Sequence, residues 1–189
     1  MKQFIVLVLA AFIPLLGFAE NTDENKKGDA QVVIDDFNQD SISRWQFVSD
    51  QVMGGVSTGE VDFVLDNDDV VAHMMGSVST ENNGGFIQFR RAISLPDALT
   101  GLRLRVRGNN QRYFVHIRTG GTVLPWQYYS AEFFASENWE NILLPFKEFS
   151  RSSRWLNRTL EPSMVRSLGI VAYGRDHQAD VQVSKLEGY

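Results

Sequence analysis

Ser57 stands in a pattern that hydrolases use to present a catalytic nucleophile. Residues 55–59 read Gly-Val-Ser-Thr-Gly, which matches Gly-x-Ser-x-Gly. That motif exposes its serine only where a strand enters a sharp turn and a helix leaves it. Residues 60–65 instead alternate polar and apolar side chains, as a strand does. We therefore interpret residues 55–59 as a glycine-rich turn and predict no catalysis at Ser57.

Carboxylates and histidines are the other groups with catalytic or metal-binding chemistry. The glutamates closest together in the second half are Glu132, Glu137 and Glu140. A glycosidase needs two such carboxylates facing each other across a cleft. Glu137 and Glu140 lie in a loop-like stretch, where solvated charge is the ordinary explanation. The three histidines lie far apart in the sequence, without the spacing of a metal pair: His73, His116 and His177. Residues 66–68 begin like a calcium loop, but Val70 occupies the next ligand position. We predict no enzyme activity, no metal site and no cofactor.

Composition limits the class of protein further. The chain has 189 residues, which is room for one ordinary domain, and a formal net charge of -5. An acidic chain is unlike a dedicated nucleic-acid binder, which usually carries a basic surface. The chain has 0 cysteines, which excludes a disulfide framework, a thiolate metal site and a cysteine nucleophile.

The amino-terminal residues have the features of an export signal. Lys2 is followed by an almost wholly apolar run to Phe18, and small residues stand at positions 17 and 19. We expect residues 1–19 to be a signal peptide, residues 20–30 to be a flexible polar leader, and residues 31–189 to form the domain. The predicted location is the periplasm or the medium, with no stable membrane span after cleavage.

The domain is dominated by period-2 alternation, which is typical of half-buried strands. The predicted strands lie near 32–37, 61–65, 70–76, 86–93, 102–107, 113–118, 127–134, 139–144, 167–173 and 179–186. Only short helical stretches are expected, around 146–150 or 161–166. Many short strands separated by Gly and Asn turns indicate an all-β, antiparallel β-sandwich of the jelly-roll type.

Arginines alternate with apolar residues on two consecutive predicted strands. If the apolar residues of both strands face the core, the polar ones share the opposite face at intervals of about 6.6 Å. We expect the two strands to be neighbours, so that their outer residues form one arginine-rich face. Its predicted members are Arg103, Arg105, Arg107, Arg112, Phe114, His116 and Arg118.

Two interpretations of this face stay open. Like charges opposite one another destabilise a sheet, so acids on a third strand would have to neutralise them within the molecule. Alternatively, the face binds a partner that carries carboxylate, sulfate or phosphate groups, or an acidic protein surface. Trp126, Tyr128 and Tyr129 follow closely in the sequence and are either core residues or flat stacking surfaces for a ligand.

Two glycine-rich segments stand out among the turns. Residues 49–57 read Ser-Asp-Gln-Val-Met-Gly-Gly-Val-Ser after Trp45, and residues 79–86 read Ser-Thr-Glu-Asn-Asn-Gly-Gly-Phe, with Arg90 just beyond. Further blocks lie at 101–113 (Gly-Leu to Arg-Tyr), 139–149 (Trp, then Leu-Pro-Phe and Phe) and 168–170 (Leu-Gly-Ile). Together these segments resemble the signature of the complex I intermediate-associated protein 30 family over nearly all of residues 31–189.

The resemblance implies a galactose-binding-like jelly roll, related in shape to carbohydrate-binding modules. The mitochondrial members of that family are non-enzymatic factors in the assembly of respiratory complex I. It also implies that Asp35, Asp36 and Asp180 lie near the calcium position of some carbohydrate-binding jelly rolls, although we do not predict a bound metal.

The glycines and the polar residues of the two glycine-rich segments are expected to have different roles. The glycines can adopt positive φ or allow close backbone approach, and we predict structural turns at Gly54, Gly55, Gly84 and Gly85. The polar residues beside them either bond the turn backbone or line a common pocket. They are Asp50, Ser57, Asn82 and Asn83.

The sequence therefore predicts a non-catalytic binding module, an assembly factor or chaperone-like protein that binds a protein partner. The expected binding surfaces are the arginine-rich face and the loops around Asp50 and Asn83. The alternative is a carbohydrate-binding module of the cell envelope that uses Trp126, Tyr128 and Arg105 for stacking and hydroxyl contacts.

Overall fold

The computed structural model describes residues 31–67 and 69–189. The predicted signal peptide at 1–19 and the leader at 20–30 lie outside the described residues. Within those ranges, no helix is both long enough and apolar enough to cross a membrane.

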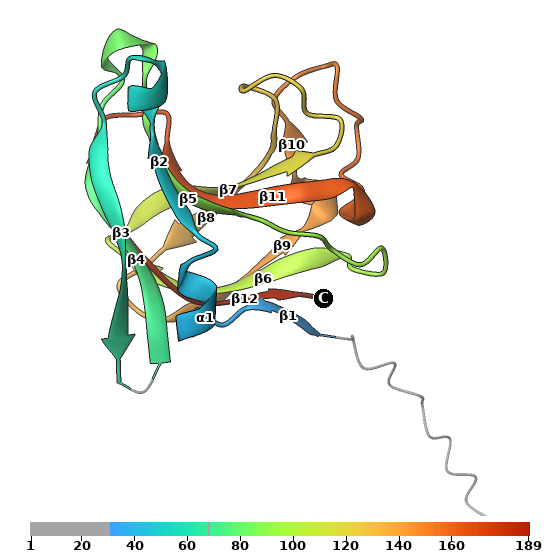
Figure 1. The fold of residues 1–189 in the computed structure, drawn as a ribbon, viewed down its shortest axis with the longest axis horizontal. Helices are drawn as coiled ribbons and strands as arrows, with labels where there is room; N and C mark the ends of the chain where they lie inside the picture. Colours follow the sequence, from blue (N-terminus) through green and yellow to red (C-terminus); the bar gives the residue numbers. More distant parts are fainter. Residues whose placement is uncertain (1–30, 68) are drawn as a thin grey trace, which may run out of the picture.

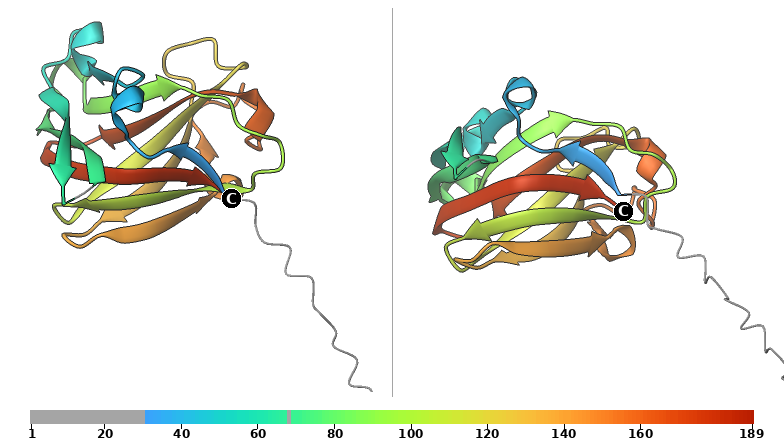
Figure 2. Two further views of the ribbon diagram at one scale, coloured as in Figure 1. Left: turned by 60° about the horizontal axis from the view of Figure 1, so that its bottom comes forward. Right: turned by 90° about the horizontal axis from the view of Figure 1, so that it is seen from below.

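Two antiparallel sheets lie face to face and form a sandwich (Figures 1 and 2). The strands are β1 (Val32–Asp35), β2 (Gln46–Ser49), β3 (Thr58–Asp66), β4 (Asp69–Val78), β5 (Phe86–Ala92), β6 (Gly101–Gly108), β7 (Gln111–Thr119), β8 (Tyr129–Ala135), β9 (Glu140–Pro145), β10 (Ser150–Arg151), β11 (Val165–Tyr173) and β12 (His177–Gly188). The helices are α1 (Gln39–Ile42) and the 3-10 turns η1 (Asp50–Met53), η2 (Glu81–Asn83), η3 (Phe146–Glu148) and η4 (Pro162–Met164). The predicted all-β antiparallel sandwich is confirmed.

Sheet A has the strand order β3-β4-β12-β6-β9, with β1 paired to the last residues of β12, and sheet B has the order β10-β8-β7-β11-β5-β2. All pairs of strands are antiparallel in the part of the chain that the structure describes. The sequence analysis did not predict β2 and β10, which are 4 and 2 residues long.

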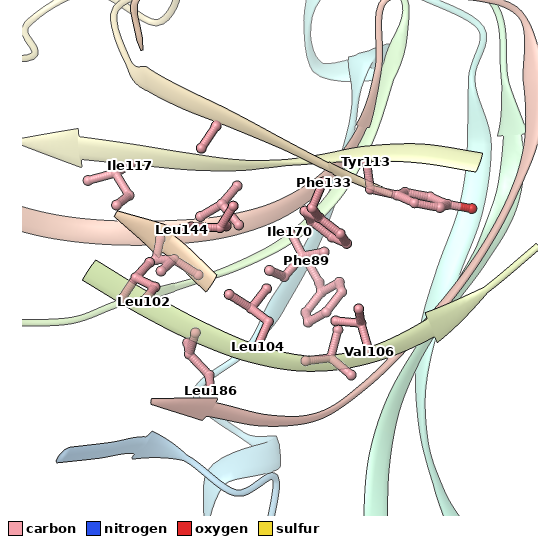
Figure 3. Close-up of a cluster of buried hydrophobic side chains, with 14 of the residues drawn as sticks. Phe89, Leu102, Leu104, Val106, Tyr113, Ile117, Phe133, Leu144, Ile170 and Leu186 are labelled. Atoms are coloured by element: carbon pink, nitrogen blue, oxygen red, sulfur yellow. The ribbon is translucent and has the colours of Figure 1, made fainter. Parts of the chain in front are cut away.

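The core lies between the two sheets and is built by the predicted alternation (Figure 3). Leu102 and Leu104 of β6 face inward from sheet A, and Tyr113 and Ile117 of β7 face inward from sheet B, all fully buried. Burial of one such side chain contributes roughly 1.5–3 kcal/mol to the hydrophobic term. The residues between them on each strand therefore point to the two outer surfaces.

The predicted pairing of β6 with β7 is wrong. β6 lies between β12 and β9 in sheet A, whereas β7 lies between β8 and β11 in sheet B. The turn at Asn109 and Asn110, with Asn110 at φ 59, carries the chain across the sandwich instead of closing a hairpin. Alternation shows which side of a strand is buried, but it does not show which strand is its neighbour. The expected arginine-rich face is thus divided: Arg103, Arg105 and Arg107 lie on the outside of sheet A, and Arg112, Phe114, His116 and Arg118 on the outside of sheet B.

The sheet A arginines have partners within the molecule. Arg107 lies 3.2 Å from a carboxylate oxygen of Asp66, and Arg103 lies 4.0 Å from one of Glu187 on the neighbouring β12. The guanidinium of Arg107 also lies 4.8 Å from the ring centroid of Trp139, and that of Arg105 at 5.5 Å. Internal neutralisation, one of the two interpretations of the sequence, therefore describes Arg103 and Arg107.

Candidate functional site

A cleft of about 200 Å³ lies on the outer face of sheet B. β5, β7 and β11 form its floor, and loops close its two ends. Met53 and Asn83 come from the turns before β3 and β5, and Trp126 and Tyr128 come from the loop between β7 and β8. Because β5 and β7 run in the same direction, the turn before β5 and the loop after β7 stand at opposite ends of the strands (Figure 1).

Strand register explains why the face is hollow. On the three central strands, His116 pairs with Gly169, and Gly169 pairs with Arg90. A Cβ at Gly169 would stand 2.9 Å from Oε1 of Gln88 and 3.3 Å from the Cβ of Arg90, so this position faces the cleft. Gly169 provides no side chain there, which leaves space between the imidazole and the guanidinium.

One wall of the cleft is aromatic. The rings of His116 and Tyr128 are stacked, with centroids 4.1 Å apart and planes 14° apart. Tyr173 lies edge-on to both rings, at 5.5 and 6.4 Å, and Phe114 continues the cluster 6.0 Å from Tyr173. Trp126 stands at the mouth with 61% of its surface exposed. Offset and edge-on arrangements of this kind are favourable for aromatic rings.

His116 is held neutral by its surroundings. Burial lowers its pKa from 6.5 to about 4, because a charged imidazole loses its hydration there. Its Nε2 atom is buried and has no hydrogen-bond partner among the described residues. A buried polar atom normally has a partner, so Nε2 is an exception among the described residues, and it is not exposed to the cleft in this structure.

The lowered pKa of His116 makes stability depend on pH. The unfolded state takes up this proton near pH 6.5 and the folded state only near pH 4, so the unfolded state binds more protons between those values. The free energy of unfolding therefore falls as pH drops through that window, by about 3 kcal/mol from this residue. His116→Phe keeps a ring on Tyr128 and removes the titration. We expect the free energy of unfolding, measured with urea, to depend less on pH in the variant. The same pH dependence in both proteins would contradict this.

Two guanidinium groups line the cleft without an acid beside them. Arg90 and Arg118 belong to its lining, and no carboxylate lies within ion-pair distance of either among the described residues. Arg118 donates to the carbonyl oxygen of Leu124 at 3.0 Å. Desolvation and the nearby charge of Arg90 lower the pKa of Arg118. The described residues that line the cleft include no Asp or Glu.

Asp50 ties together the two turns at one end of the cleft. Its fully buried carboxylate accepts hydrogen bonds from the Ser57 backbone N–H at 2.9 Å, from Ser57 Oγ at 2.5 Å and from the Gly85 N–H at 2.5 Å. The Phe86 N–H donates to it at 3.2 Å. Burial alone would raise the pKa of Asp50, but these donors outweigh it and lower the pKa. We call Asp50, Ser57 and the segment 84–86 the Asp50 clasp.

Glycines make the clasp sterically possible. Gly55 and Gly84 lie directly against the carboxylate, and a Cβ at either position would overlap it. Gly54 and Gly85 have φ of +91 and +123, a region that other residues rarely adopt. Crowding or positive φ therefore explains why all four positions are glycine.

The structure brings some predicted site residues together and separates others. Asn83, His116, Arg118, Trp126 and Tyr128 line the cleft, and Phe114 adjoins its aromatic wall. Asp50 and Ser57 are fully buried and bond turn backbone, as one interpretation of the sequence predicts. Asn82 is exposed on η2 at φ 54 and is not part of the lining. The remaining members, Arg103, Arg105 and Arg107, lie on the other sheet.

The structure also separates the aspartates that the resemblance relates to calcium. Asp35 accepts from Trp45 Nε1 at 3.1 Å and forms an ion pair with Arg91. Asp180 lies toward the other end of β12 from the residue paired with Asp35, about 20 Å along the strand, and bonds His73 at 2.8 Å. In the part of the chain that the structure describes, no group of three or more His, Asp or Glu side chains forms a potential metal site.

The candidate catalytic groups also lie apart from the cleft. β3 follows Ser57 where the hydrolase motif needs a helix, and the Ser57 hydroxyl is committed to Asp50. Glu132 lies 3.7 Å from Arg112, while Glu137 and Glu140 accept hydrogen bonds from Asn110 and Ser136. None of these four residues lines the cleft.

Sequence reasoning missed much of the cleft lining. Gln88, Arg90, Gly169 and Tyr173 were not predicted as site residues, and all four line it. The polar residues of β5 alternate with buried Ile87 and Phe89, so their outward direction was readable. Their position beside His116 was not, because it depends on β11 lying between β5 and β7.

Comparison with known proteins identifies the fold and the family. The family model for complex I intermediate-associated protein 30 matches residues 35–183. A family 11 carbohydrate-binding module from Clostridium thermocellum, solved with a β-1,3-1,4-mixed-linked tetrasaccharide, is 13% identical with a TM-score of 0.67, covering 84% of this chain and 94% of that chain. A family 30 carbohydrate-binding module is 13% identical with a TM-score of 0.52, covering 70% and 83%. No curated protein matches the chain in sequence.

Proposed function

The chain belongs to the complex I intermediate-associated protein 30 family, and we propose that it is an exported, non-catalytic binding protein whose ligand is a glycan held in the cleft on sheet B. The observation that carries the proposal is the aromatic wall of the cleft. His116, Tyr128 and Tyr173 form a continuous surface there, and Trp126 adds an exposed ring at the mouth.

Sugars suit such a surface because a pyranose ring has an apolar face and a polar rim. The apolar face covers an aromatic ring, and the rim hydroxyls need hydrogen-bond partners at the edge. Gln88 and Asn83 offer such partners in the same cleft. Both similar structures named above are carbohydrate-binding modules, and one was solved with a tetrasaccharide, which supports the proposal.

A glycan array followed by calorimetry tests this function. We expect the protein to bind at least one glycan, and we expect Trp126→Ala and Tyr128→Ala each to weaken that binding about tenfold, since each removes a stacking surface. Trp155→Ala is the matched control, because Trp155 is 79% exposed but is not part of the cleft. Binding that is equally weak in all three variants, or no binding to any glycan, would contradict the proposal.

A protein partner is the second candidate function, and one surface favours it. Val52, Met53 and Val56 are 75%, 55% and 40% exposed around η1, and Met53 also lines the cleft. Exposed apolar side chains that gather in one place often mark protein interfaces. The family description, which refers to intermediates of complex I, points in the same direction.

Cross-linking in envelope extracts separates the two functions. If a protein partner is the ligand, a defined species captured by the wild type should be lost in the double variant Val52→Ser/Met53→Ser. It should persist in Leu65→Ser, which changes an equally exposed residue, 75%, on the hairpin of β3 and β4. Capture that is identical in all three proteins would remove this candidate.

A further inference from the structure

The charge of the cleft is opposite to that of the protein. The whole chain has a formal net charge of -5, yet the cleft is lined by Arg90 and Arg118 and, among the described residues, by no acid. The nearest outward carboxylate on the neighbouring β8 is that of Glu132, which is engaged by Arg112 at 3.7 Å. The positive charge of the cleft is therefore not neutralised within the described part of the molecule.

The two guanidiniums flank one spot on the floor. Arg118 pairs in register with Ser167 of β11, and Arg90 pairs with Gly169 of the same strand. The two arginines thus stand on either side of β11, two strand spacings apart across the sheet and two residues apart along it, which separates their Cα atoms by about 12 Å. Between them, β11 presents only the hydroxymethyl group of Ser167 and the hydrogen of Gly169. An anionic group therefore has space to reach both guanidiniums. Desolvation and the mutual repulsion that lowers the pKa of Arg118 make an anion favourable at this point.

Structural roles do not account for both arginines. Most other arginines on the outer faces have a partner, such as Asp66 for Arg107 and Glu132 for Arg112. Holding two like charges in a partly buried cleft without a counter-charge costs stability. Guanidinium forks match the geometry of a carboxylate, which can accept two parallel hydrogen bonds.

From this geometry we infer that the ligand is an acidic glycan containing uronic acid, with the carboxylate between Arg90 and Arg118 and the sugar ring against the face of Tyr128 that does not cover His116. This inference rests on the proposed function and narrows it. A uronate carries its carboxylate at the edge of the pyranose ring, so one residue of the glycan can stack by its face and be held by its charge. His116 stands two residues before Arg118 on β7 and opposite Arg90 across Gly169, so the aromatic wall and both arginines border the same floor.

The test compares acidic and neutral glycans, among them one pair that differs only by esterification of the carboxylates. Calorimetry with the purified protein uses polygalacturonate, the same polymer as its neutral methyl ester, neutral mixed-linkage β-glucan, and dextran sulfate. We expect polygalacturonate to bind at least about tenfold more tightly than its methyl ester, with an affinity that falls as salt is added. Tighter binding of dextran sulfate than of polygalacturonate would overturn the carboxylate assignment.

Variants connect the effect to the cleft. Arg90→Gln and Arg118→Gln should each weaken polygalacturonate binding at least about tenfold, and Arg112→Gln, which lies outside the cleft on the same sheet, should not. Circular dichroism and urea unfolding verify that the variants fold. If β-glucan binds and polygalacturonate does not, the acidic ligand is wrong and the glycan-binding function stands. If no glycan binds, both are wrong.

Discussion

Asp50→Ala is expected to lower the free energy of unfolding by about 3–5 kcal/mol, because it leaves several hydrogen-bond donors without an acceptor. The variant leaves the N–H groups of Ser57, Gly85 and Phe86 without their acceptor in a buried place. Each unsatisfied buried donor costs roughly 1–3 kcal/mol. Urea unfolding followed by tryptophan fluorescence measures the loss.

Two further variants make the Asp50 result specific. Asp97→Ala removes an exposed aspartate from the segment between β5 and β6 and should change stability by less than about 0.5 kcal/mol. Asp50→Asn keeps the shape of the side chain but directs an amide NH₂ at one of the donors, so it should also destabilise the protein, by less than alanine does. A stability of Asp50→Ala equal to that of Asp97→Ala would show that the Asp50 clasp contributes little.

Gly169→Val is expected to abolish most of the ligand binding while leaving the fold intact. The new side chain would occupy the floor of the cleft between His116 and Arg90. Its Cβ would stand closest to the flexible end of Gln88, which can move, and 3.3 Å from the Cβ of Arg90, which must shift by a few tenths of an ångström. Valine is otherwise favourable in a strand. Crowding of a fitted contact costs roughly 1–3 kcal/mol, so we expect about thirtyfold weaker binding of whichever glycan the wild type selects.

The measurement for Gly169→Val combines calorimetry with unfolding. A melting temperature close to that of the wild type, together with lost affinity, would place the ligand on the floor of the cleft. Ala172→Val would be a poor control because Ala172 is buried in the core. Ser130→Val is a better one, since Ser130 pairs with the opposite side of His116 on β8 and is not part of the cleft lining. Unchanged binding in Gly169→Val would exclude the cleft floor as the site.

The fold was predictable because alternation is a local property. Leu102, Leu104, Tyr113 and Ile117 are all buried as their spacing indicates, and the family signature gave the same architecture. The site was predictable only in part, because it depends on which strands are neighbours. Asn110 could close a hairpin or carry the chain across the sandwich, and the same residues allow both.

The cleft shows how strongly strand order controls a functional surface. Residues of β5 and β7 meet across β11, which follows them in the sequence by about fifty residues or more. Arg90 stands near the segment of residues 79–86 in the sequence, yet the residue that faces it across the cleft is His116. No local pattern contains that relationship, whereas Trp126 and Tyr128 were found because their residue types alone suggest stacking.

The Asp50 clasp has a consequence for what a shared signature can tell. Its carboxylate and its crowded glycines fix the backbone at one end of the cleft, while the proposed recognition uses residues such as Arg90, Gly169 and Tyr173 on strands further along the chain. The residues of the Asp50 clasp and the residues of the cleft lining can therefore change independently of each other. Two proteins that share the same glycine-rich segments therefore share the same turns at this end of the cleft, and each can bind a different ligand.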